Sequence, residues 1–429
     1  AIFLPFSEIG LIIVDEEHEP SYKQQDPAPR YHARSAAIMM AHWYGARVLL
    51  GTATPSIESY YNALTGKYEL VEMKERFRSL QLPAITMIDL QRQYHRKEMY
   101  GHFADPLVHR IREELTKGKQ IILFQNRRGY APVLQCTKCG EAPKCGNCDV
   151  SMTFHKATHS LVCHYCGHRE PVPNACPKCG NVELKDKGFG TEKVLEELAV
   201  RFPDYKAGRL DLDVTQTKHA YDKIFTAFST GEIKILVGTQ MVAKGLDFEN
   251  VGLVGVLNAD NLLNYPDFRS DERAFQLLVQ VAGRAGRRNK RGLVLIQTAQ
   301  TEHAVMPAII QNNYALFYNK QVMLRQMFSY PPFVRVINIY VKCNDYNTCY
   351  RAVMSLSKEL SVSFGDQLLG PDKPPVSKVQ KLHIQKLMLK LPVGQSMVES
   401  KKRINTAIEN LKKQYDLRKQ INYRYFHDN

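Results

Sequence analysis

The sequence lacks any long uninterrupted apolar run, although 44% of its 429 residues are hydrophobic. A membrane-spanning helix needs about 18 to 20 apolar residues in a row, so we expect no contact with a membrane. No positively charged segment precedes the first apolar stretch, which argues against a secretory signal. Internal repeats and low-complexity tracts are also missing. These absences leave an ordinary globular protein of two to four domains, since one core rarely serves so long a chain.

Acidic residues are fewer than basic ones, 43 against 58, and the net charge is +15. A basic excess of this size favours a polyanionic partner, most often nucleic acid. A protein that is simply basic fits the same number, so charge alone leaves both interpretations open.

Eight of the ten cysteines form four C-x-x-C pairs within one short segment. The pairs are Cys136/Cys139, Cys145/Cys148, Cys163/Cys166 and Cys176/Cys179. Two such pairs complete a tetrahedral zinc site with four thiolate ligands. A disulfide framework would need an oxidising compartment, and a redox pair would not recur four times. We therefore predict two structural zinc ions, with all eight cysteines as ligands and no position left open for catalysis.

The spacing also predicts which pairs share an ion. Only five residues separate the first two pairs, whereas 14 separate the second and third, as in an ordinary zinc ribbon. The second and third pairs should then share one ion, which leaves the first and fourth for the other. Histidines nearby are expected on the surface and not as ligands: His155, His159, His164 and His168.

Strand and helix patterns alternate over residues 9–72 and again from about 105 to 297, which predicts α/β layers. The cysteine segment interrupts the second block, between the strand Gln120–Phe124 and a helix starting at Thr191. After residue 330 the order changes to strand, helix, strands and helix. This order predicts a split βαβ domain with a basic end.

Two polar motifs directly follow the strands of the first block, Asp15-Glu16-Glu17-His18 and Gly51-Thr52-Ala53-Thr54-Pro55-Ser56. Ligands of open α/β sheets bind at the carboxyl ends of strands. There Asp15 could hold Mg²⁺, and Glu16 could activate the water that attacks a γ-phosphate. Thr52 and Thr54 could bond to both the acidic motif and a phosphate. The alternatives are an acidic strand end and an ordinary helix cap.

The second block contains Gly238–Phe248, with Gly245 and Asp247, and later Gln280-Val281-Ala282-Gly283-Arg284-Ala285-Gly286-Arg287. Two arginines three residues apart on a helix share a face. Arg284 and Arg287 could therefore stabilise the charge of a phosphoryl transition state. A basic surface helix is the alternative, but glycines in a helix destabilise it.

In this order the four motifs resemble motifs II, III, V and VI of superfamily-2 helicases. Further segments narrow the resemblance to the PriA family of replication-restart DNA helicases, over essentially the whole chain: Gln125–Pro132, Gly188–Lys193, Ala259-Asp260 and Pro266–Arg269. The resemblance implies ATP-driven 3′→5′ translocation on single-stranded DNA, recognition of stalled or abandoned forks, and initiation of primosome assembly. It also implies ATP, Mg²⁺ and two zinc ions as cofactors. The catalytic residues would be Asp15, Glu16, Gln280, Arg284 and Arg287, and the nucleotide-binding residues His18, Thr52, Thr54, Gly245 and Asp247.

Residues 21–34 resemble the aromatic-rich loop that couples DNA contact to ATP hydrolysis in this family. Tyr22 and Tyr31 could stack on bases, while Lys23, Arg30 and Arg34 meet phosphates. A basic solvated loop is the alternative. The resemblance implies forked DNA, other primosome proteins and single-stranded-DNA-binding protein as partners of a monomer in the bacterial cytoplasm, associated with the nucleoid.

The resemblance predicts an incomplete first and a complete second RecA-like helicase lobe, a double zinc-ribbon insertion and a C-terminal α+β domain. The expected limits are 1–75 for the end of lobe 1, 76–133 for a linker and the start of lobe 2, 134–181 for the zinc insertion, 182–315 for the rest of lobe 2, and 316–429 for the C-terminal domain, which would bind DNA or partners.

The family's phosphate loop, G-x-x-x-x-G-K-[ST], is absent, and the chain starts at Ala1. The chain therefore resembles a family member truncated at its N-terminus. Without this loop no lysine contacts the β- and γ-phosphates, so we expect no ATP hydrolysis by the chain alone. The alternative function is a non-enzymatic, zinc-dependent platform for DNA or partners. A different superfamily-2 motor acting on RNA fits the double zinc insertion less well.

Overall fold

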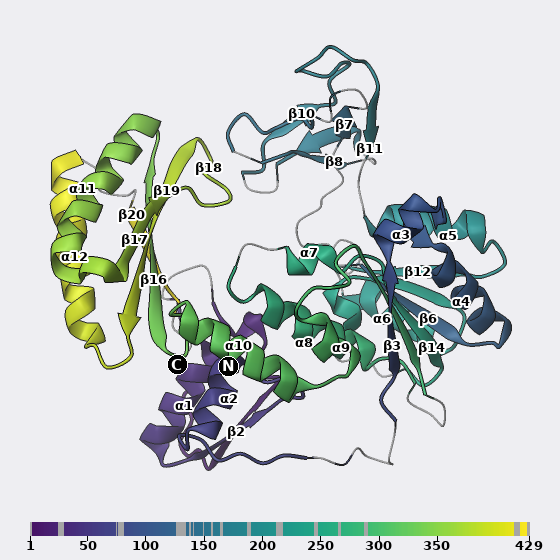
Figure 1. Ribbon diagram of the computed structural model, residues 1–429, viewed down its shortest axis with the longest axis horizontal. Helices are drawn as coiled ribbons and strands as arrows, with labels where there is room; N and C mark the ends of the chain where they lie inside the picture. Colours follow the sequence, from purple (N-terminus) through teal and green to yellow (C-terminus); the bar gives the residue numbers. More distant parts are fainter. Residues whose placement is uncertain are drawn as a thin grey trace. The chain divides into compact units, whose positions relative to one another are not determined.

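Figure 1 shows the computed structural model, which divides by its internal contacts into two units. Unit 1 comprises residues 1–72, 318–377 and 382–429, and unit 2 comprises residues 73–317 and 378–381. The structure describes residues 2–24, 30–73, 75, 81–125, 134–136, 139, 141–148, 150–155, 158–163, 166–186, 190–211, 218–243, 248–264, 267–286, 291–415 and 421–426.

Unit 2 is built on a six-stranded parallel sheet with the strand order β12-β13-β6-β14-β15-β3. Its strands are β3 (Ala84–Asp89), β6 (Gln120–Phe124), β12 (Ala207–Leu210), β13 (Ile235–Gly238), β14 (Val251–Val256) and β15 (Leu293–Thr298). Every residue of β6 and β13 is buried. Parallel sheets are covered on both faces, which explains why these strands read as continuous apolar runs.

Helices cover both faces of this sheet. In Figure 1, α4 (Asp105–Thr116) and α5 (Thr191–Arg201) lie on one side, and α6 (Lys218–Ser229), α8 (Ser270–Ala282) and α9 (Met306–Ile310) on the other. Leu107 and Ile111 of α4 join Val194 and Leu198 of α5 in one buried cluster against the sheet. Each pair is spaced at i and i+4, so both residues lie on one helix face. The shorter elements of the unit are α3 (Leu90–His95), β4 (Met99–Tyr100), β5 (Phe103–Ala104), η4 (Gln240–Ala243) and α7 (Asp260–Leu263).

The strand β3 was not predicted from the sequence. It pairs in parallel with β15 over its whole length, Ala84 opposite Leu293 and Asp89 opposite Thr298. The segment assigned to a linker and the start of lobe 2 therefore supplies the edge strand of the sheet. Only pairing with a strand about 200 residues away along the chain identifies it.

The cysteine segment lies between β6 and α5, as predicted, and it forms small antiparallel sheets. The strands β7 (Leu134–Cys136) and β11 (Leu184–Asp186) pair where the segment leaves and rejoins the lobe. Inside it lie β8 (Thr153–His155), β9 (Ser160–Val162) and β10 (Arg169–Pro171).

The N-terminal part of unit 1 contains a parallel strand pair with two helices. The strands are β1 (Leu11–Asp15) and β2 (Arg47–Gly51), and they are accompanied by η1 (Pro20–Tyr22), α1 (Ala33–Tyr44) and α2 (Ile57–Leu64). Ser56 caps α2 by accepting the Ser59 backbone N–H, a standard way to start a helix.

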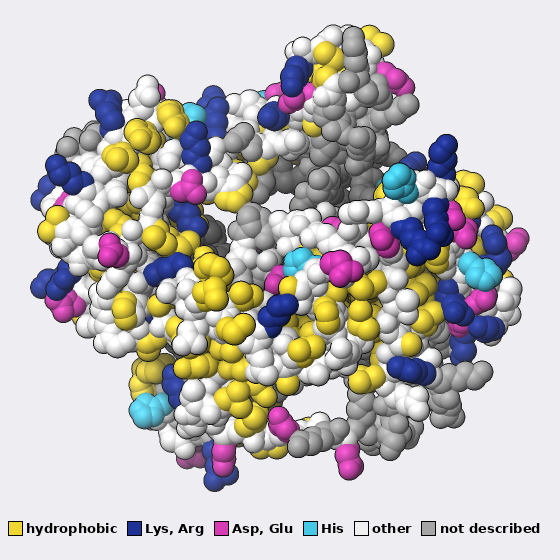
Figure 2. All heavy atoms as spheres, in the orientation of Figure 1, with side chains coloured by type: hydrophobic (Ala, Val, Ile, Leu, Met, Phe, Trp, Pro, Cys, Tyr) yellow, Lys and Arg dark blue, Asp and Glu magenta, His cyan; other side chains and the backbone are white. Residues whose placement is uncertain are grey.

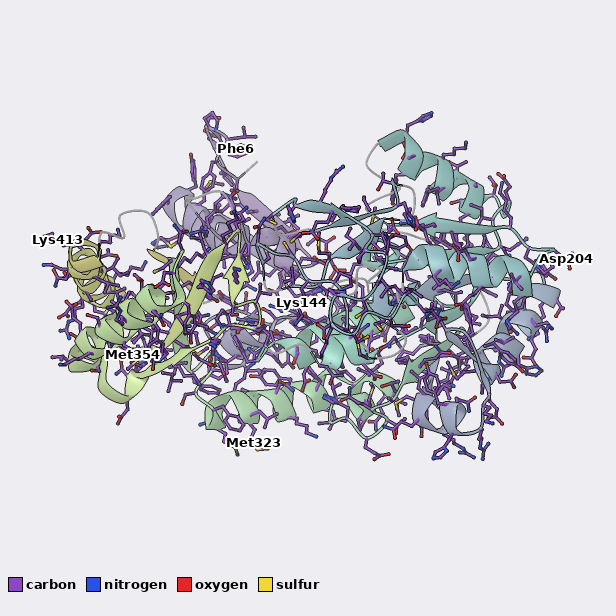
Figure 3. The ribbon with its side chains drawn as sticks, turned by 90° about the horizontal axis from the view of Figure 1, so that it is seen from above. Phe6, Lys144, Asp204, Met323, Met354 and Lys413 are labelled. Atoms are coloured by element: carbon purple, nitrogen blue, oxygen red, sulfur yellow. The ribbon has the colours of Figure 1, made fainter. Side chains whose placement is uncertain are left out.

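The C-terminal part has the predicted split βαβ topology, with the sheet order β17-β19-β16-β20. Its elements are β16 (Val334–Cys343), α11 (Tyr346–Phe364), η5 (Gly365–Gln367), β17 (Leu368–Asp372), β18 (Lys378–Val379), β19 (Leu382–Pro392), α12 (Met397–Tyr415) and β20 (Ile421–Phe426). The helices α11 and α12 pack against each other, and Figure 3 labels Met354 on the first and Lys413 on the second. Cys343 and Cys349 are buried in this core.

The two parts of unit 1 are packed together, although the sequence suggested separate domains 1–75 and 316–429. Arg325 lies on α10 (Tyr314–Met327) and is 2% exposed. Its Nη1 donates to Glu58 Oε1 at 2.8 Å and to the Pro331 carbonyl at 3.0 Å. The Tyr60 and Tyr318 rings meet edge to face at 4.7 Å, and burial raises the pKa of Tyr318 to about 12. Within the described part of the chain, no helix is long and apolar enough to cross a membrane.

Glu197 on α5 binds His102 in the turn between β4 and β5 of unit 2. Its Oε1 lies 2.7 Å from His102 Nδ1, and its Oε2 accepts the His102 backbone N–H at 2.9 Å. Burial by itself raises the pKa of Glu197, but the bonds to His102 outweigh it and hold the pKa below its usual 4.5. A carboxylate whose pKa is lower in the folded state stabilises the fold at pH values above its unfolded pKa. This stabilisation is lost as pH falls through the folded pKa.

We therefore expect Glu197→Gln to lower the free energy of unfolding by about 1–3 kcal/mol at neutral pH. The deficit should shrink as pH falls from about 4.5 through the lower folded pKa, because the wild-type carboxyl is protonated first in the unfolded state and then in the folded state. Urea unfolding at neutral pH and at a pH below the folded pKa measures this. Glu196→Gln, on the exposed side of the same helix, is the matched control. A deficit that is the same at both pH values would contradict the linkage.

Candidate functional site

The eight cysteines form two clusters, Cys136/Cys139/Cys176/Cys179 and Cys145/Cys148/Cys163/Cys166, each with its four sulfurs within 4.8 Å of one another. Sγ–Sγ distances are 3.5 Å for Cys136–Cys179, 3.6 Å for Cys139–Cys176 and 3.7 Å for Cys145–Cys166. A tetrahedron of sulfurs about 2.3 Å from zinc has edges of about 3.8 Å, whereas a disulfide is about 2.05 Å long. Both clusters therefore fit zinc, and the pairing is the nested one that the spacing predicted.

Each C-x-x-C pair is closed by the same backbone hydrogen bond. The N–H of its first cysteine donates to the carbonyl five residues later: Cys136 to Glu141 at 2.8 Å, Cys145 to Val150 at 3.0 Å, Cys163 to His168 at 2.8 Å and Cys176 to Asn181 at 2.8 Å. Gly167 and Gly180 follow their pairs in the left-handed region, at φ 72° and 70°, where glycine is favoured. The local sequence thus prearranges two thiols for one ion.

Four thiols cannot all ionise in so small a volume without a cation. In the second cluster, the His168 backbone N–H lowers the pKa of Cys166 to about 7, whereas burial raises that of Cys148 to about 12. A divalent ion supplies the missing charge, and an all-thiolate set suits zinc. The His168 ring lies 2.7 Å from Glu170, and the His159 ring packs on Phe154, so neither is a ligand. The His155 and His164 side chains lie outside the described residues.

Nested pairing makes a specific prediction for zinc content. Changing all of Cys136, Cys139, Cys176 and Cys179 to serine should leave one zinc ion per chain, because one complete four-cysteine cluster survives. Changing Cys136, Cys139, Cys163 and Cys166 instead should remove both ions, because each cluster keeps only two thiols. Elemental analysis of the purified proteins measures the ratio. Equal zinc content in the two variants would contradict the pairing.

The acidic motif and the threonine motif lie together in unit 1. The strands β1 and β2 are parallel with Asp15 opposite Gly51, so both motifs begin at one edge. His18 Nδ1 and Thr52 Oγ1 are 2.8 Å apart, and Thr52 Oγ1 donates to Glu16 Oε2 at 3.4 Å. The Thr54 backbone N–H donates to Thr52 Oγ1 at 3.1 Å. His18 is nearly buried, at 3% side-chain exposure, whereas Glu16 at 39% can reach a ligand.

Behind this edge lies a buried network that the sequence analysis did not predict. Glu17, 1% exposed, accepts the Ser56 backbone N–H at 2.6 Å and the Ser59 hydroxyl at 2.8 Å. It also forms an ion pair with Arg34, which in turn donates to Ser56 Oγ at 2.9 Å. The network fixes the start of α2, and with it the threonine motif, against the acidic motif.

The position of Arg34 corrects its assignment to DNA binding. The residue is 5% exposed and is engaged by Glu17, so its guanidinium does not face a phosphate. The signal for this was in the sequence: Arg34, Ala37 and Ala41 are spaced as one helix face, and all three are buried in α1.

The other predicted DNA contacts flank residues 25–29, which lie outside the described part of the chain. The Gln24 N–H donates to the Tyr31 carbonyl at 2.9 Å, and the backbones of Lys23 and His32 form an isolated antiparallel β-bridge. The Tyr31 ring meets Phe3 at 4.8 Å. The Tyr22 hydroxyl donates to the Asp15 carbonyl at 2.7 Å, which joins this segment to the acidic motif. Arg30 is partly exposed beside it.

The predicted motifs V and VI belong to unit 2. Gln280 lies in the last turn of α8, which packs against η4 after β13. The prediction that Arg284 and Arg287 share a helix face is wrong for Arg284, because α8 ends at Ala282. Gly283 caps the helix, and Gly286 adopts a φ of 71° in the turn that follows. Gly245, Asp247 and Arg287 lie outside the described residues.

Breaking the buried network should destabilise unit 1. Arg34→Met leaves the Glu17 carboxylate buried without its counter-charge, which typically costs about 3–5 kcal/mol. The double variant Arg34→Met/Glu17→Gln should recover part of this loss. Fluorescence of Trp43, the single tryptophan, reports unfolding from α1. Arg47→Met on exposed β2 is the control, and an Arg34→Met protein as stable as that control would contradict this role.

The parallel sheet with polar motifs at its strand ends, together with a pair of four-cysteine clusters inserted after β6, defines the lobe of a RecA-like helicase that carries a zinc-binding insertion. Residues 182–289 match the helicase conserved C-terminal domain, and residues 145–171 match the PriA DNA helicase Cys-rich region domain.

Curated relatives give the particular family. The chain is 41% identical to the replication restart protein PriA of Bacillus subtilis (strain 168) over 392 residues, 91% of this chain and 48% of that protein. Identity to the Chlamydia pneumoniae PriA is 41% over 339 residues, covering 79% of this chain and 45% of the relative. Identity to the Haemophilus influenzae PriA is 38% over 395 residues, covering 91% of this chain and 53% of the relative. The chain belongs to the PriA family and spans about half the length of these relatives.

Proposed function

We propose that the protein acts as an ATP-dependent 3′→5′ DNA helicase that recognises stalled or abandoned replication forks and initiates primosome assembly. The observation that carries this is the joint placement of Glu16, His18 and Thr52 at one edge of β1 and β2, in a chain of the PriA family. Zinc would serve the fold or partner contact, because each ion would be enclosed by four thiolates with no open position.

The nucleotide chemistry is assigned to residues at the strand ends. Asp15 is exposed at the end of β1 and would hold Mg²⁺, and Glu16 would activate the attacking water. His18 and Thr52 would keep Glu16 in place. Bound Mg²⁺ and ATP would supply the phosphoryl group and part of the charge stabilisation. From unit 2 we assign Gln280, Arg284 and Arg287 to catalysis, and Gly245 and Asp247 to nucleotide binding.

DNA contact is assigned to Tyr22, Lys23, Arg30 and Tyr31 and to the C-terminal domain. The Tyr22 bond to the Asp15 carbonyl supports a link between DNA contact and the acidic motif. Figure 2 shows Lys and Arg side chains on the C-terminal domain, which fits phosphate contact. Forked DNA, primosome proteins and single-stranded-DNA-binding protein are the proposed partners of a monomer in the bacterial cytoplasm, associated with the nucleoid.

One observation favours a platform role for this chain taken alone. Leu11, Ile13 and Leu49 on β1 and β2 are 54%, 63% and 52% exposed. Parallel strands are normally covered on both faces, so this strand pair by itself lacks the burial of a working lobe. The chain alone would then bind DNA or partners without hydrolysing ATP.

A DNA-stimulated ATPase assay with matched binding measurements tests both statements. We expect the chain alone to bind forked DNA, with affinity falling as salt rises, and to release no phosphate above background. A longer protein that carries the G-x-x-x-x-G-K-[ST] loop should hydrolyse ATP on DNA. Its Glu16→Gln variant should lose about 100-fold or more in turnover. Robust turnover by the chain alone would refute the platform role, and turnover unaffected by Glu16→Gln would refute the helicase assignment.

A further inference from the structure

A short turn far along the chain lies on the second four-cysteine cluster. The Gln380 backbone N–H donates to Cys148 Sγ at 3.1 Å, across 232 residues of sequence. The Lys381 N–H donates to the Asn147 carbonyl at 2.7 Å, and Lys378 Nζ donates to the Gly146 carbonyl at 3.3 Å. Three residues of the Cys145–Cys148 loop are thus engaged by one turn.

An apolar contact supports these bonds. Val379 packs against the small core of the zinc insertion, which includes Met152, Phe154 and Leu161. A core this small gives limited stability by itself. One added apolar side chain and three hydrogen bonds therefore matter for the stability of the zinc insertion.

The backbone of the turn is unusual for its residues. Gln380 and Lys381 have φ values of 51° and 66° and form a two-residue turn between β18 and β19. Turns of this kind normally contain Asn-Gly, because larger side chains resist positive φ. Such conformations persist where the surroundings hold them, often at ligand contacts. Here the turn directs two successive N–H groups at the cysteine loop, an arrangement that suits a negatively charged acceptor.

We propose that the Gln380–Lys381 turn is a clasp on the second zinc site. It supplies an N–H to the zinc-bound thiolate of Cys148 and slows loss of the ion. The turn, residues 378–381, belongs to unit 2 by its contacts, whereas the chain on both sides of it, up to Ser377 and from Leu382, belongs to unit 1. Seating of this turn and retention of zinc in the second site are therefore linked, and by reciprocity removing the zinc releases the turn.

The first test is the rate at which a chromogenic chelator takes zinc from the full chain. Inserting two glycines between Gln380 and Lys381 displaces both N–H groups. We expect about tenfold faster release from the second site, since hydrogen bonds to metal ligands typically change metal affinity about 10- to 100-fold. The variant Gln380→Asn/Lys381→Gly keeps the turn and its N–H groups and should release zinc at the unchanged rate. Two glycines inserted after Gly394, in an exposed turn with open space around it, are the matched control.

The two sites are distinguished in chains that keep one cluster each. With only Cys145, Cys148, Cys163 and Cys166 present, the two added glycines should accelerate zinc release. With only the first cluster present, they should have no effect. Equal acceleration at both sites would mean general loosening of the zinc insertion and would overturn the proposal, as would an unchanged rate at the second site.

Amide hydrogen exchange provides a readout without any change to the turn. The Gln380 and Lys381 amides should be protected in the zinc-loaded chain and should exchange at least tenfold faster after chelation. In a chain whose first cluster is replaced by serine, the protection should persist until the second ion is removed. Exchange at these amides that does not depend on the second ion would refute the clasp.

Discussion

The zinc insertion depends on one electrostatic condition, that four thiolates share a space only a few ångströms across. In the second cluster, burial raises the pKa of Cys148 and the His168 backbone N–H lowers that of Cys166, and only some of the four thiols can be charged without a cation. A divalent ion removes this conflict and holds together strands that bury little apolar surface. The integrity of the insertion would thus depend on metal and, by our proposal, on the turn at Gln380.

The acidic motif depends on a different kind of support. Glu16 is partly exposed at the end of β1 beside Thr52 and the nearly buried His18, and Glu17 and Arg34 form a neutralised pair behind them. A buried ion pair contributes little net stability but fixes one arrangement when its hydrogen bonds are complete. The exposed carboxylate therefore stands on a network that holds α2 and β1 in one geometry.

The two parts of unit 1 show where sequence patterns mislead about domains. The change of pattern after residue 330 correctly predicted a split βαβ domain. It did not reveal that Arg325 reaches Glu58 or that Tyr318 packs on Tyr60. These contacts join residues more than 250 positions apart, and neither side carries a local sequence signature of its partner.

The sequence by itself determined the features that depend on neighbouring residues. Cysteine spacing gave the metal and its pairing, apolar runs gave the parallel strands, and the order of the motifs gave the family. Tertiary structure alone decided that β3 is an edge strand, that Arg34 pairs with Glu17 and that Gln380 reaches Cys148. The reason is physical: spacing and periodicity are set by local backbone geometry, whereas these three outcomes depend on which distant side chain or strand offers the complementary charge or hydrogen bond.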